Sequence, residues 1–356
     1  MAGFTVQEIR ARIARFPKQT LIHLPTPFRK LDRLSAELGG PEVYIKRDDL
    51  TGLAFGGNKS RKLEFIIADA LSKGADVIIT WASLQSNWCL QTAAAARRFG
   101  LQPILVLFKT YDLAPEYDGN LLLDYIVGAD IRIREAEKGK VVSEEQAVGI
   151  IEEISNEVRE WGHKPYVVSV GGSLPGFSMD LPLGAISHAA AFVELLEQAE
   201  SGGVSPTHVV IATGSGATQA GLTVAAMALK KDVEIIGISV SEEKEAFARI
   251  VLKISEETER ALGLDSSIKR DDIIVLDDYL KEGYGHVNRE VAEAIRLAFT
   301  REGIVLDPVY TGKAMAALID LVTKGRFSKK DRVVFFHTGG TPALFPYRKT
   351  LIELLG

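Results

Sequence analysis

The sequence predicts an α/β fold of two open, twisted, mostly parallel sheets flanked by helices. Its length of 356 residues suggests about two domains, at roughly 150 residues each. Short Val- and Ile-rich runs alternate with helix-length segments, a pattern typical of parallel sheets that are covered on both faces. The predicted strands are Val43–Lys46, Asp76–Thr80, Pro103–Leu107, Asp130–Ile133, Tyr166–Val170, His208–Ala212, Glu234–Ser239, Ile273–Val275 and Arg332–Phe336. The predicted helices include Asn87–Phe99, Glu144–Trp161, Gly216–Leu229 and Asn288–Thr300.

This alternation divides the chain into two units. Residues 61–175 contain four strand–helix alternations of their own, and residues 176–356 contain a second set. We expect residues 1–60 to pack with the second set. The sequence therefore predicts a small domain over 61–175 and a large domain over 1–60 plus 176–356. In open parallel sheets a ligand lies beyond the carboxyl ends of the strands, so the loops there are the candidate sites.

Three segments are predicted to lie at the surface. Met1–Thr20 predicts a short amphipathic helix, because Val6, Ile9 and Ile13 lie at helical spacing. Glu135–Gln146 and Ala199–Pro206, which are charged or rich in glycine, are predicted to be surface loops.

Composition and charge exclude several classes of protein. A net charge of -5 and a pI near 5.8 argue against a nucleic-acid or anionic-membrane partner. One Cys cannot form an internal disulfide, and six dispersed His residues show no paired ligand spacing, so no metal site is predicted. No stretch approaches the roughly 20 apolar residues that span a bilayer, and a cytoplasmic location is the expectation.

The first candidate for chemistry is a lysine that follows two glycines. The segment reads Gly56-Gly57-Asn58-Lys59-Ser60-Arg61-Lys62 and precedes a helical run. Lys59 would lie near a helix N-terminus beside Arg61 and Lys62, which would disfavour its ammonium form. A free amine of this kind can attack a carbonyl group. An exposed loop lysine is the alternative, and Asn58, between the glycine and the lysine, excludes a phosphate-binding P-loop.

A glycine-rich turn is the second candidate. The segment Thr213-Gly214-Ser215-Gly216-Ala217-Thr218 follows a predicted strand and precedes a helix rich in small residues. Backbone N–H groups at such a helix N-terminus favour a phosphate group. A nicotinamide dinucleotide is disfavoured, because the third glycine of its motif is missing and the strand Ile235–Ser239 does not end in an acid. A tight turn without a ligand is the other alternative.

Polar residues also gather at other predicted strand ends. Leu84-Gln85-Ser86-Asn87-Trp88 opens a predicted helix, where amide and hydroxyl groups suit a substrate carboxylate. Helix capping by Ser86 or Asn87 is the alternative. Late in the chain come Gly283-Tyr284-Gly285, Leu306-Asp307-Pro308-Val309-Tyr310-Thr311-Gly312-Lys313 and His337-Thr338-Gly339-Gly340. Each is a turn with a hydroxyl-bearing residue, and His337 is predicted to be a packed core histidine.

In this order, the segments resemble the pyridoxal 5′-phosphate (PLP) enzymes of the tryptophan synthase β-like fold. The branch they resemble contains D-cysteine desulfhydrase, 1-aminocyclopropane-1-carboxylate (ACC) deaminase and L-cysteate sulfo-lyase. The resemblance begins at Leu24-Pro25-Thr26-Pro27 and Tyr44-Ile45-Lys46-Arg47-Asp48-Asp49 and ends at His337-Thr338-Gly339-Gly340-Thr341-Pro342-Ala343-Leu344-Phe345. It implies that PLP is the cofactor and that the large domain binds it.

The resemblance also implies roles for individual residues. Lys59 would form the Schiff base with PLP and act as the base at the substrate Cα. The phosphate would be held by Gly214, Ser215, Gly216, Ala217 and Thr218, with Lys62 as a further cation. Asn87 would hydrogen-bond to the phenolic oxygen of PLP, and Ser86 would contact the substrate and take part in proton transfer as a catalytic residue. Tyr284 and Tyr310 would line the substrate side of the ring.

Two cofactor-binding positions favour one activity within the branch. ACC deaminases have Glu after the tyrosine that corresponds to Tyr310, and this chain has Thr311; where they have Leu, it has Thr338. A neutral partner for the pyridine nitrogen makes PLP a weaker electron sink, which suffices for β-elimination but disfavours ACC deamination. The resemblance therefore implies a carbon–sulfur lyase of the D-cysteine desulfhydrase type, which forms pyruvate, sulfide and ammonia. L-cysteate sulfo-lyase or another β-eliminating lyase, an NAD-dependent oxidoreductase and a non-catalytic PLP-fold binding protein are the alternatives.

The sequence departs from that branch beside the expected substrate site. Trp88 stands where the branch usually has His or Gln, and Trp81-Ala82-Ser83 replaces a run of small residues. Trp88 would add apolar volume next to the substrate; packing of Trp81 and Trp88 into the core is the alternative. Cys89 is predicted to be an inert buried thiol. The expected partners are a small amino acid substrate and a second copy of the chain in a homodimer, with no nucleic acid and no membrane.

Overall fold

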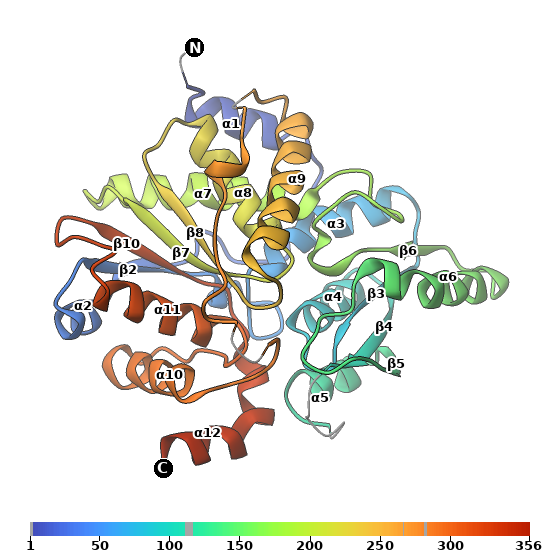
Figure 1. The fold of residues 1–356 in the computed structure, drawn as a ribbon. Coiled ribbons are helices and arrows are strands. Elements are labelled where there is room, and N and C mark those ends of the chain that lie inside the picture. The colour runs from blue at the N-terminus through green and yellow to red at the C-terminus, as the bar shows by residue number, and fades with distance from the viewer. Residues whose placement is uncertain (1–2, 111–116, 266, 281–282) are drawn as a thin grey trace.

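The computed structural model describes residues 3–110, 117–265, 267–280 and 283–356, which form two sheets covered by helices (Figure 1). The strands are β1 Phe28–Lys30, β2 Glu42–Arg47, β3 Val77–Ser83, β4 Gln102–Lys109, β5 Asp130–Glu135, β6 Pro165–Val167, β7 His208–Thr213, β8 Glu234–Ser239, β9 Ile274–Leu276 and β10 Arg332–His337. The helices are α1 Val6–Ile13, α2 Asp32–Leu38, α3 Lys59–Ser72, α4 Asn87–Arg98, α5 Gly119–Ile126, α6 Glu144–Glu160, α7 Leu183–Ser201, α8 Ala217–Ala228, α9 Lys244–Leu262, α10 Arg289–Glu302, α11 Thr311–Thr323 and α12 Arg348–Leu355. Short 3₁₀ turns lie at Asp48–Leu50, Val170–Gly172, Arg270–Asp272 and Thr341–Tyr347.

The larger sheet has six strands in the order β1-β2-β10-β7-β8-β9. All neighbours in it run parallel except β1, which is antiparallel to β2 at the edge. Val334 of β10 lies opposite Tyr44 of β2 on one side and Val209 of β7 on the other. The two mostly parallel sheets confirm the predicted fold class. The near-continuous Val and Ile runs predicted it because both faces of such strands are buried.

The smaller sheet has four parallel strands in the order β5-β4-β3-β6. Two predicted boundaries in it are wrong by three residues. Strand β3 continues to Ser83, three residues beyond the predicted end at Thr80. Strand β6 stops at Val167, because Val170–Gly172 turn away as a 3₁₀ turn with Gly171 at φ 72°. All strands of this sheet fall within residues 77–167, and those of the larger sheet within 28–47 and 208–337; the proposed domain boundaries at 60 and 175 stay a prediction.

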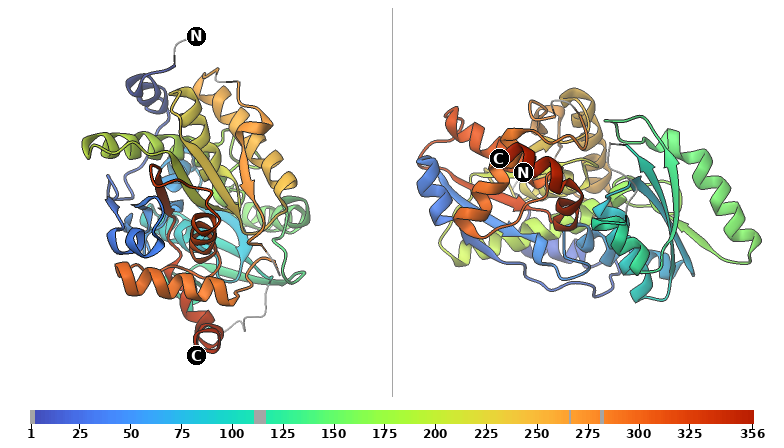
Figure 2. Two further views of the ribbon diagram at one scale, coloured as in Figure 1. Left: turned by 60° about the vertical axis from the view of Figure 1, so that its left-hand side comes forward. Right: turned by 90° about the horizontal axis from the view of Figure 1, so that it is seen from below.

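Successive side chains of the larger sheet point to opposite faces, and each face packs against its own layer of helices. Val209 and Ile211 of β7 pack on the side of α7, α8 and α9, whereas Val210 and Ala212 pack on the side of α2, α10, α11 and α12. Helix α6 covers the outer face of the smaller sheet, and Figure 2 shows it outside β3, β4 and β5. Helix α3 packs against both α4 and α7. It therefore joins the helical layers of the two sheets, and its N-terminus lies where the sheets meet.

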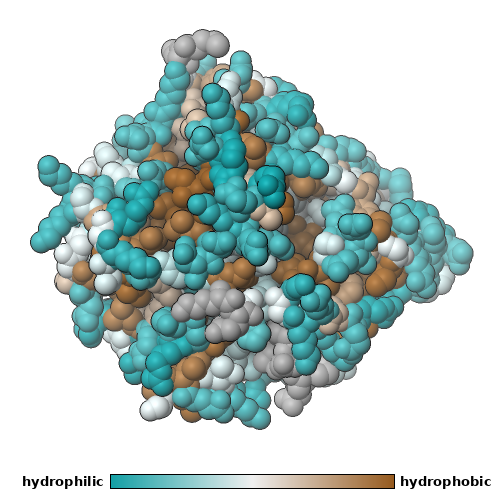
Figure 3. Space-filling model, in the orientation of Figure 1, coloured by the Kyte–Doolittle hydropathy of each residue, from teal (hydrophilic) through white to brown (hydrophobic). Residues whose placement is uncertain are grey.

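The structure confirms the predicted N-terminal helix and agrees in part with the two predicted surface loops. Helix α1 buries Ile9 and Ile13 as expected, and its N-terminus is capped by Thr5. The predicted loop Glu135–Gln146 is wrong at both ends, since Glu135 ends β5 and α6 begins at Glu144. Helix α7 likewise extends to Ser201 within the second predicted loop. Figure 3 shows a largely hydrophilic surface with apolar side chains in the recess between the parts that carry the two sheets. Within the described residues, every helix is too short or too polar to cross a bilayer.

Candidate active site

A cavity lies at the carboxyl ends of β3, β7 and β10, between the two sheets. The predicted site residues that line it are Lys59, Lys62, Ser86, Asn87, Trp88, Gly214, Ser215, Gly216, Thr218, Tyr284, Tyr310 and Thr338. These residues come from loops spread over most of the chain, and the topology brings them together because parallel strands end at the same edge of a sheet. Two predicted residues, Ala217 and Thr311, are buried behind the wall and do not line the cavity.

Lys59 is the first residue of α3 and points its ammonium group into the cavity. The nitrogen lies 5.1 Å from the centre of the Tyr310 ring and has no hydrogen-bond partner among the described residues. Burial lowers the pKa of Lys59 to about 8, although the Asp307 carboxylate acts in the opposite direction. A lysine with this pKa supplies far more free amine near neutral pH than an ordinary lysine does, as a carbonyl-attacking nucleophile requires.

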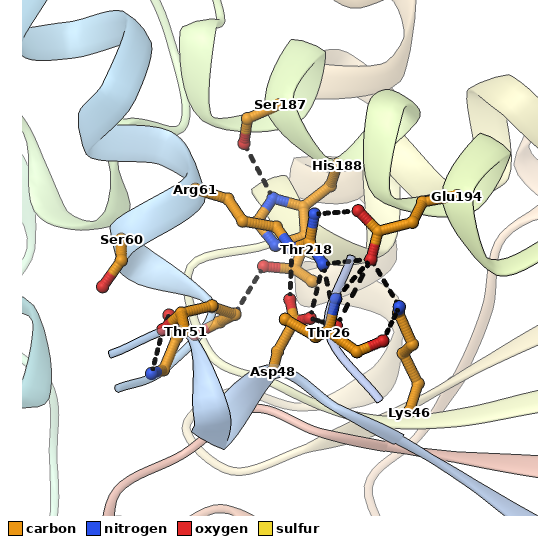
Figure 4. A network of polar contacts seen from close by, with 12 residues as sticks. Thr26, Lys46, Asp48, Thr51, Ser60, Arg61, Ser187, His188, Glu194 and Thr218 are labelled. Atoms are coloured by element: carbon orange, nitrogen blue, oxygen red, sulfur yellow. Dashed lines mark hydrogen bonds and ion pairs between the residues drawn. The ribbon is translucent and has the colours of Figure 1, made fainter. Parts of the chain in front are cut away.

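The sequence predicted that the Arg61 charge lowers the pKa of Lys59, and this prediction is wrong. The Arg61 guanidinium turns away from Lys59 and enters a buried network of charges on the other side of α3 (Figure 4). Arg61 Nε donates to Asp48 Oδ2 at 2.7 Å, and Arg61 Nη2 donates to Glu194 Oε1 at 2.9 Å. Two carboxylates thus neutralise this cation, so burial lowers the Lys59 pKa without it. Spacing along a helix could not reveal which way the guanidinium points.

Lys62 lies one helical turn beyond Lys59 and is completely enclosed. Its ammonium donates to the Gly171 carbonyl oxygen at 3.1 Å, and burial together with the Lys59 charge lowers the pKa of Lys62. Neither lysine forms an ion pair with a carboxylate among the described residues. Two neighbouring cations without an anion are costly in a buried site, and an anionic group bound between them would offset that cost.

The glycine-rich turn supplies the other half of an anion site. Gly216 has a φ of 83°, which a side chain would disfavour, and it caps the N-terminus of α8. Thr218 Oγ1 accepts a hydrogen bond from Asn58 Nδ2 at 2.9 Å, which connects the turn to the residue before Lys59. The buried Thr213 hydroxyl has no partner among the described residues. Exposed backbone N–H groups, an unsatisfied hydroxyl and the Lys62 ammonium fit a phosphate group.

Ser86 and Asn87 open α4 at another wall of the cavity. The Ser86 hydroxyl accepts a hydrogen bond from the Cys89 N–H at 3.1 Å, so the capping alternative is correct for this residue. Its own proton stays available, since accepting a bond leaves a hydroxyl free to donate. Asn120 Nδ2 donates to Asn87 Oδ1 at 2.8 Å, which fixes the Asn87 amide with its NH₂ group uncommitted within the described residues. Both side chains can therefore donate to an oxygen atom in the cavity.

Two tyrosine hydroxyls face each other beside Lys59. Tyr284 and Tyr310 are joined by a hydrogen bond of 2.7 Å between their hydroxyl oxygens, and the Ser83 side chain also hydrogen-bonds to Tyr284. Burial raises the pKa of Tyr284, and the bonds from Tyr310 and Ser83 partly offset the increase. The three hydroxyls can hold a proton close to the Lys59 amine.

Thr311 has a different environment from the one expected of a cofactor ligand. Its hydroxyl donates to Asp307 Oδ1 at 2.7 Å, and its backbone N–H donates to the same carboxylate oxygen at 2.8 Å. Asp307 is completely buried and also accepts hydrogen bonds from the N–H groups of Val309 and Tyr310. This carboxylate stabilises the turn that carries Tyr310. Thr338 lines the cavity, and its carbonyl oxygen accepts a hydrogen bond from the Asn58 N–H at 3.0 Å.

The unusual aromatic residues serve two purposes. Trp88 lines the cavity, yet its indole N–H donates to Thr80 Oγ1 at 2.8 Å, so only apolar ring atoms are left for a ligand. Trp81 packs in the core between the smaller sheet and α6, as the alternative for this residue held. Cys89 is a buried free thiol, and burial raises its pKa, which agrees with an inert side chain. His337 is also fully buried, and its Nε2 lies 3.0 Å from the Val305 carbonyl oxygen, as predicted for a core histidine.

Sequence analysis missed several residues at this site. Ser83, Val141, Gly171 and Ser241 line the cavity, and Asp307 acts on the Lys59 charge. Asp307 lies in the same short segment as Tyr310, which the sequence singled out, so its position beside a predicted site residue was an available signal. Val141 had no such signal, because it follows a charged stretch that is typical of a surface loop.

A parallel α/β fold with a reactive lysine and an anion site at the strand ends defines a class of enzymes that hold a phosphorylated carbonyl cofactor. Residues 19–339 match the family of pyridoxal-phosphate dependent enzymes. The chain belongs to this family, and pyridoxal 5′-phosphate is its cofactor.

Relatives extend over nearly the whole chain. A putative 1-aminocyclopropane-1-carboxylate deaminase of Pyrococcus horikoshii is 40% identical over 348 residues, covering 98% of this chain and 99% of that protein. A D-cysteine desulfhydrase of Klebsiella pneumoniae is 41% identical over 342 residues, covering 95% and 98%. The crystal structure of an ACC deaminase homologue superimposes with a TM-score of 0.87 at 39% identity, covering 98% of this chain and 99% of that one. Sequence identity of about 40% to both activities identifies the branch but leaves the substrate open.

The residues of the cavity fit PLP at its aldehyde and at its phosphate. Lys59 would bind the aldehyde carbon, and the turn Gly214–Thr218 with Lys62 would hold the phosphate. The Asn87 amide would donate to the phenolic oxygen. The match rests on two buried lysines without an anion and on the unsatisfied Thr213 hydroxyl.

Proposed function

We propose that this member of the PLP-dependent lyase family removes the β-substituent from a small amino acid, with D-cysteine as the substrate. The balanced reaction consumes one water and gives pyruvate, hydrogen sulfide and ammonia. When bound, PLP supplies an electron sink for the pair released at the substrate Cα. The chain must therefore bind the substrate carboxylate, remove the Cα proton and return a proton to the departing sulfur.

The absence of a carboxylate from the described cavity wall carries this proposal. The described residues that line the cavity include no Asp or Glu, and Thr311 follows Tyr310 where ACC deaminases are expected to have Glu. A pyridine nitrogen without an acidic partner withdraws electrons weakly. A departing thiolate needs little withdrawal because it carries the electron pair away, whereas opening of a cyclopropane ring has no such leaving group. The neutral wall favours β-elimination over ACC deamination.

Three groups of residues would share the work. The Ser86 hydroxyl and the Asn87 amide at the N-terminus of α4 can donate to the substrate carboxylate, where the helix dipole also favours a negative charge. Lys59 would remove the Cα proton, since its lowered pKa makes the amine available as a base. The hydroxyl pair of Tyr284 and Tyr310 would return a proton to sulfur.

L-cysteate sulfo-lyase activity is the main alternative. A sulfonate carries a charge that buried sites normally pair with a cation. Among the described lining residues the cations are Lys59 and Lys62, and both have a proposed role toward the cofactor. The indole ring of Trp88 offers a sulfonate no donor, because its N–H is bonded to Thr80. These observations favour a β-substituent that is uncharged in the bound substrate, such as a thiol.

Parallel product assays test the proposal. Purified protein with PLP is supplied with D-cysteine, L-cysteine, L-cysteate or ACC, and sulfide, sulfite, pyruvate and 2-oxobutanoate are measured. Sulfide and equimolar pyruvate from D-cysteine are expected to exceed every other product. Sulfite from L-cysteate with no sulfide would overturn the substrate but keep the lyase class. A normal PLP spectrum that no amino acid alters would favour a non-catalytic binding protein.

We also propose that the chain acts as a homodimer in the cytoplasm, with residues 1–60 plus 176–356 as the cofactor-binding domain and 61–175 as the smaller one. Gel filtration with light scattering tests the homodimer. Limited proteolysis near residues 60 and 175 tests the division into domains.

A further inference from the structure

The segment 136–142, here called the strap, crosses from one sheet to the other. It connects β5, the edge strand of the smaller sheet, to α6 (Figure 1). Gly139 donates its backbone N–H to the Thr110 carbonyl oxygen at 2.6 Å, directly after β4. The Gly139 carbonyl oxygen accepts a hydrogen bond from the backbone N–H of Tyr284 at 3.0 Å. One residue of the strap therefore links the smaller sheet to a tyrosine of the candidate active site.

This contact requires glycine on both sides. Gly139 has a φ of 78°, in the left-handed region that side chains disfavour. Gly283, which precedes Tyr284, has a φ of 111°, and a Cβ atom there would lie 2.8 Å from the Gly139 carbonyl oxygen. At Gly283 the two backbones approach more closely than a residue with a side chain would allow. The close approach fixes the backbone position of Tyr284 and therefore the region that its hydroxyl can reach.

The two valines of the strap point to opposite sides. Val141 lines the candidate active site and packs against the core cluster of the larger sheet, which includes Tyr284. Val142 packs against the core between the smaller sheet and α6. The charged residues Glu137, Lys138 and Lys140 are exposed, which explains why the sequence predicts a surface loop here. The strap thus places one apolar side chain into the cavity while it is anchored on the other sheet.

We propose that the strap is part of the substrate site, with Gly139 as a positioning residue for Tyr284 and Val141 as the wall that closes over the bound amino acid. The contact between Gly139 and Tyr284 holds the tyrosine pair in place beside Lys59, and Val141 bounds the space that a bound amino acid would occupy. The proposal rests on the proposed function only in taking an amino acid as the ligand.

The backbone contact is tested first, without reference to turnover. Hydrogen exchange of the peptide that contains the Tyr284 amide is followed by mass spectrometry in the PLP-loaded protein. Gly139→Ala is expected to accelerate this exchange about tenfold, since alanine is strained in the left-handed region. The control is Gly149→Ala in α6, where a Cβ meets nothing within 4 Å and the exchange should not change. Equal exchange in both variants would overturn the positioning role.

The wall is tested by a pair of neighbouring valines. Val141→Ala is expected to raise the KM for the amino acid substrate about fivefold or more, with a smaller effect on kcat, because it removes binding surface. It should also accelerate the reaction of bound PLP with hydroxylamine, a small probe of access. Val142→Ala, which loses the same atoms on the other side, should change neither quantity. Equal effects of the two variants would overturn the role of Val141.

The two proposals fail in different ways. If no amino acid is turned over, the proposed function fails, but the exchange at Tyr284 and the hydroxylamine reaction still decide the role of the strap. If D-cysteine is turned over and both variant pairs behave alike, the function stands and the strap is only a connection between β5 and α6.

Discussion

Two hollows of this molecule differ in what their polar groups do. The outer groove, bounded by α1, α3 and α7, has a volume of about 980 Å³. Its charged side chains neutralise one another: Arg61 pairs with Asp48 and Glu194, and Arg10 pairs with Glu197 at the rim. A buried charge network of this kind is complete within the chain and needs no ligand.

The candidate active site leaves its polar groups unmatched. Among the described residues, Lys59 has no hydrogen-bond partner, Lys62 donates only to a carbonyl oxygen, and the Thr213 hydroxyl has no partner. Opposite faces of α3 carry these two arrangements, because Arg61 points to the groove and Lys59 and Lys62 point to the cavity. Unsatisfied buried groups indicate a ligand site better than the volume of a hollow does.

Removal of Lys59 gives the largest expected effect. Lys59→Ala should eliminate covalently attached PLP and reduce kcat/KM by about 10³-fold or more, since it removes both the attachment point and the base. The measurements are visible absorbance after gel filtration and product formation. Lys73→Ala, at the C-terminal end of the same helix, is the control and should leave both unchanged. An unaltered PLP absorbance in Lys59→Ala would reject the assignment.

Substitutions in the outer groove are expected to change the stability of the protein and not its chemistry. Arg61→Met leaves Asp48 buried without its cation and leaves Glu194 with Lys46 alone, which should lower the free energy of unfolding by about 3–5 kcal/mol. Urea denaturation of the PLP-free protein measures this change. Arg10→Met breaks an exposed pair with Glu197 and should cost less than about 1 kcal/mol. Equal losses for the two arginines would contradict the contrast between a buried network and a rim contact.

Strand and helix positions were largely readable because buried parallel strands leave continuous Val and Ile runs. The antiparallel edge strand Phe28–Lys30 was missed, since three residues with a mixed burial pattern carry no periodicity. The neighbours of each strand could not be read either. Strand β10 pairs with β2, about 290 positions away in the sequence, and with β7, about 125 positions away. Only the folded chain shows these pairings.

The site was readable where chemistry is concentrated in a short segment. Lys59, Ser86 and Tyr310 each lie in such a segment, and the cavity contains all three. Side-chain direction was not readable, which is why the sequence placed Arg61 beside Lys59; the role of Thr311 toward the cofactor stays a prediction. Val141 could not be found at all, because its role depends on where the strap crosses.

The pH dependence of cofactor capture tests the electrostatics of the cavity. Burial lowers the pKa of Lys59 to about 8, so below that pH the PLP-free protein holds the ammonium form, which cannot attack an aldehyde. The rate of PLP attachment should rise about tenfold from pH 7 to pH 9 and then level off. Stopped-flow absorbance measures this rate. A rise that continues to the ordinary lysine pKa would show that burial does not act on Lys59.

The lowered pKa of Lys59 also determines how the free energy of unfolding depends on pH. The folded PLP-free protein binds a proton at Lys59 less readily than the unfolded chain does. The penalty is therefore fully present below pH 8 and is relieved as the pH rises from about 8 to the unfolded lysine pKa. The free energy of unfolding of the PLP-free protein should therefore increase over this pH window relative to that of Lys59→Ala.

The smallest expected effect separates the two tryptophans. Trp88→Phe removes the N–H that donates to Thr80, and should cost about 1 kcal/mol of hydrogen-bond stability beyond the lost ring volume. Trp81→Phe removes an N–H that is buried without a partner among the described residues, so the polar part of its change should be neutral or favourable. Because Trp88 lines the cavity and Trp81 lies in the core under α6, only Trp88→Phe should also change the KM for the substrate. Urea denaturation and steady-state kinetics measure the two quantities; a KM that is unchanged in Trp88→Phe and raised in Trp81→Phe would reverse the assignment of wall and core.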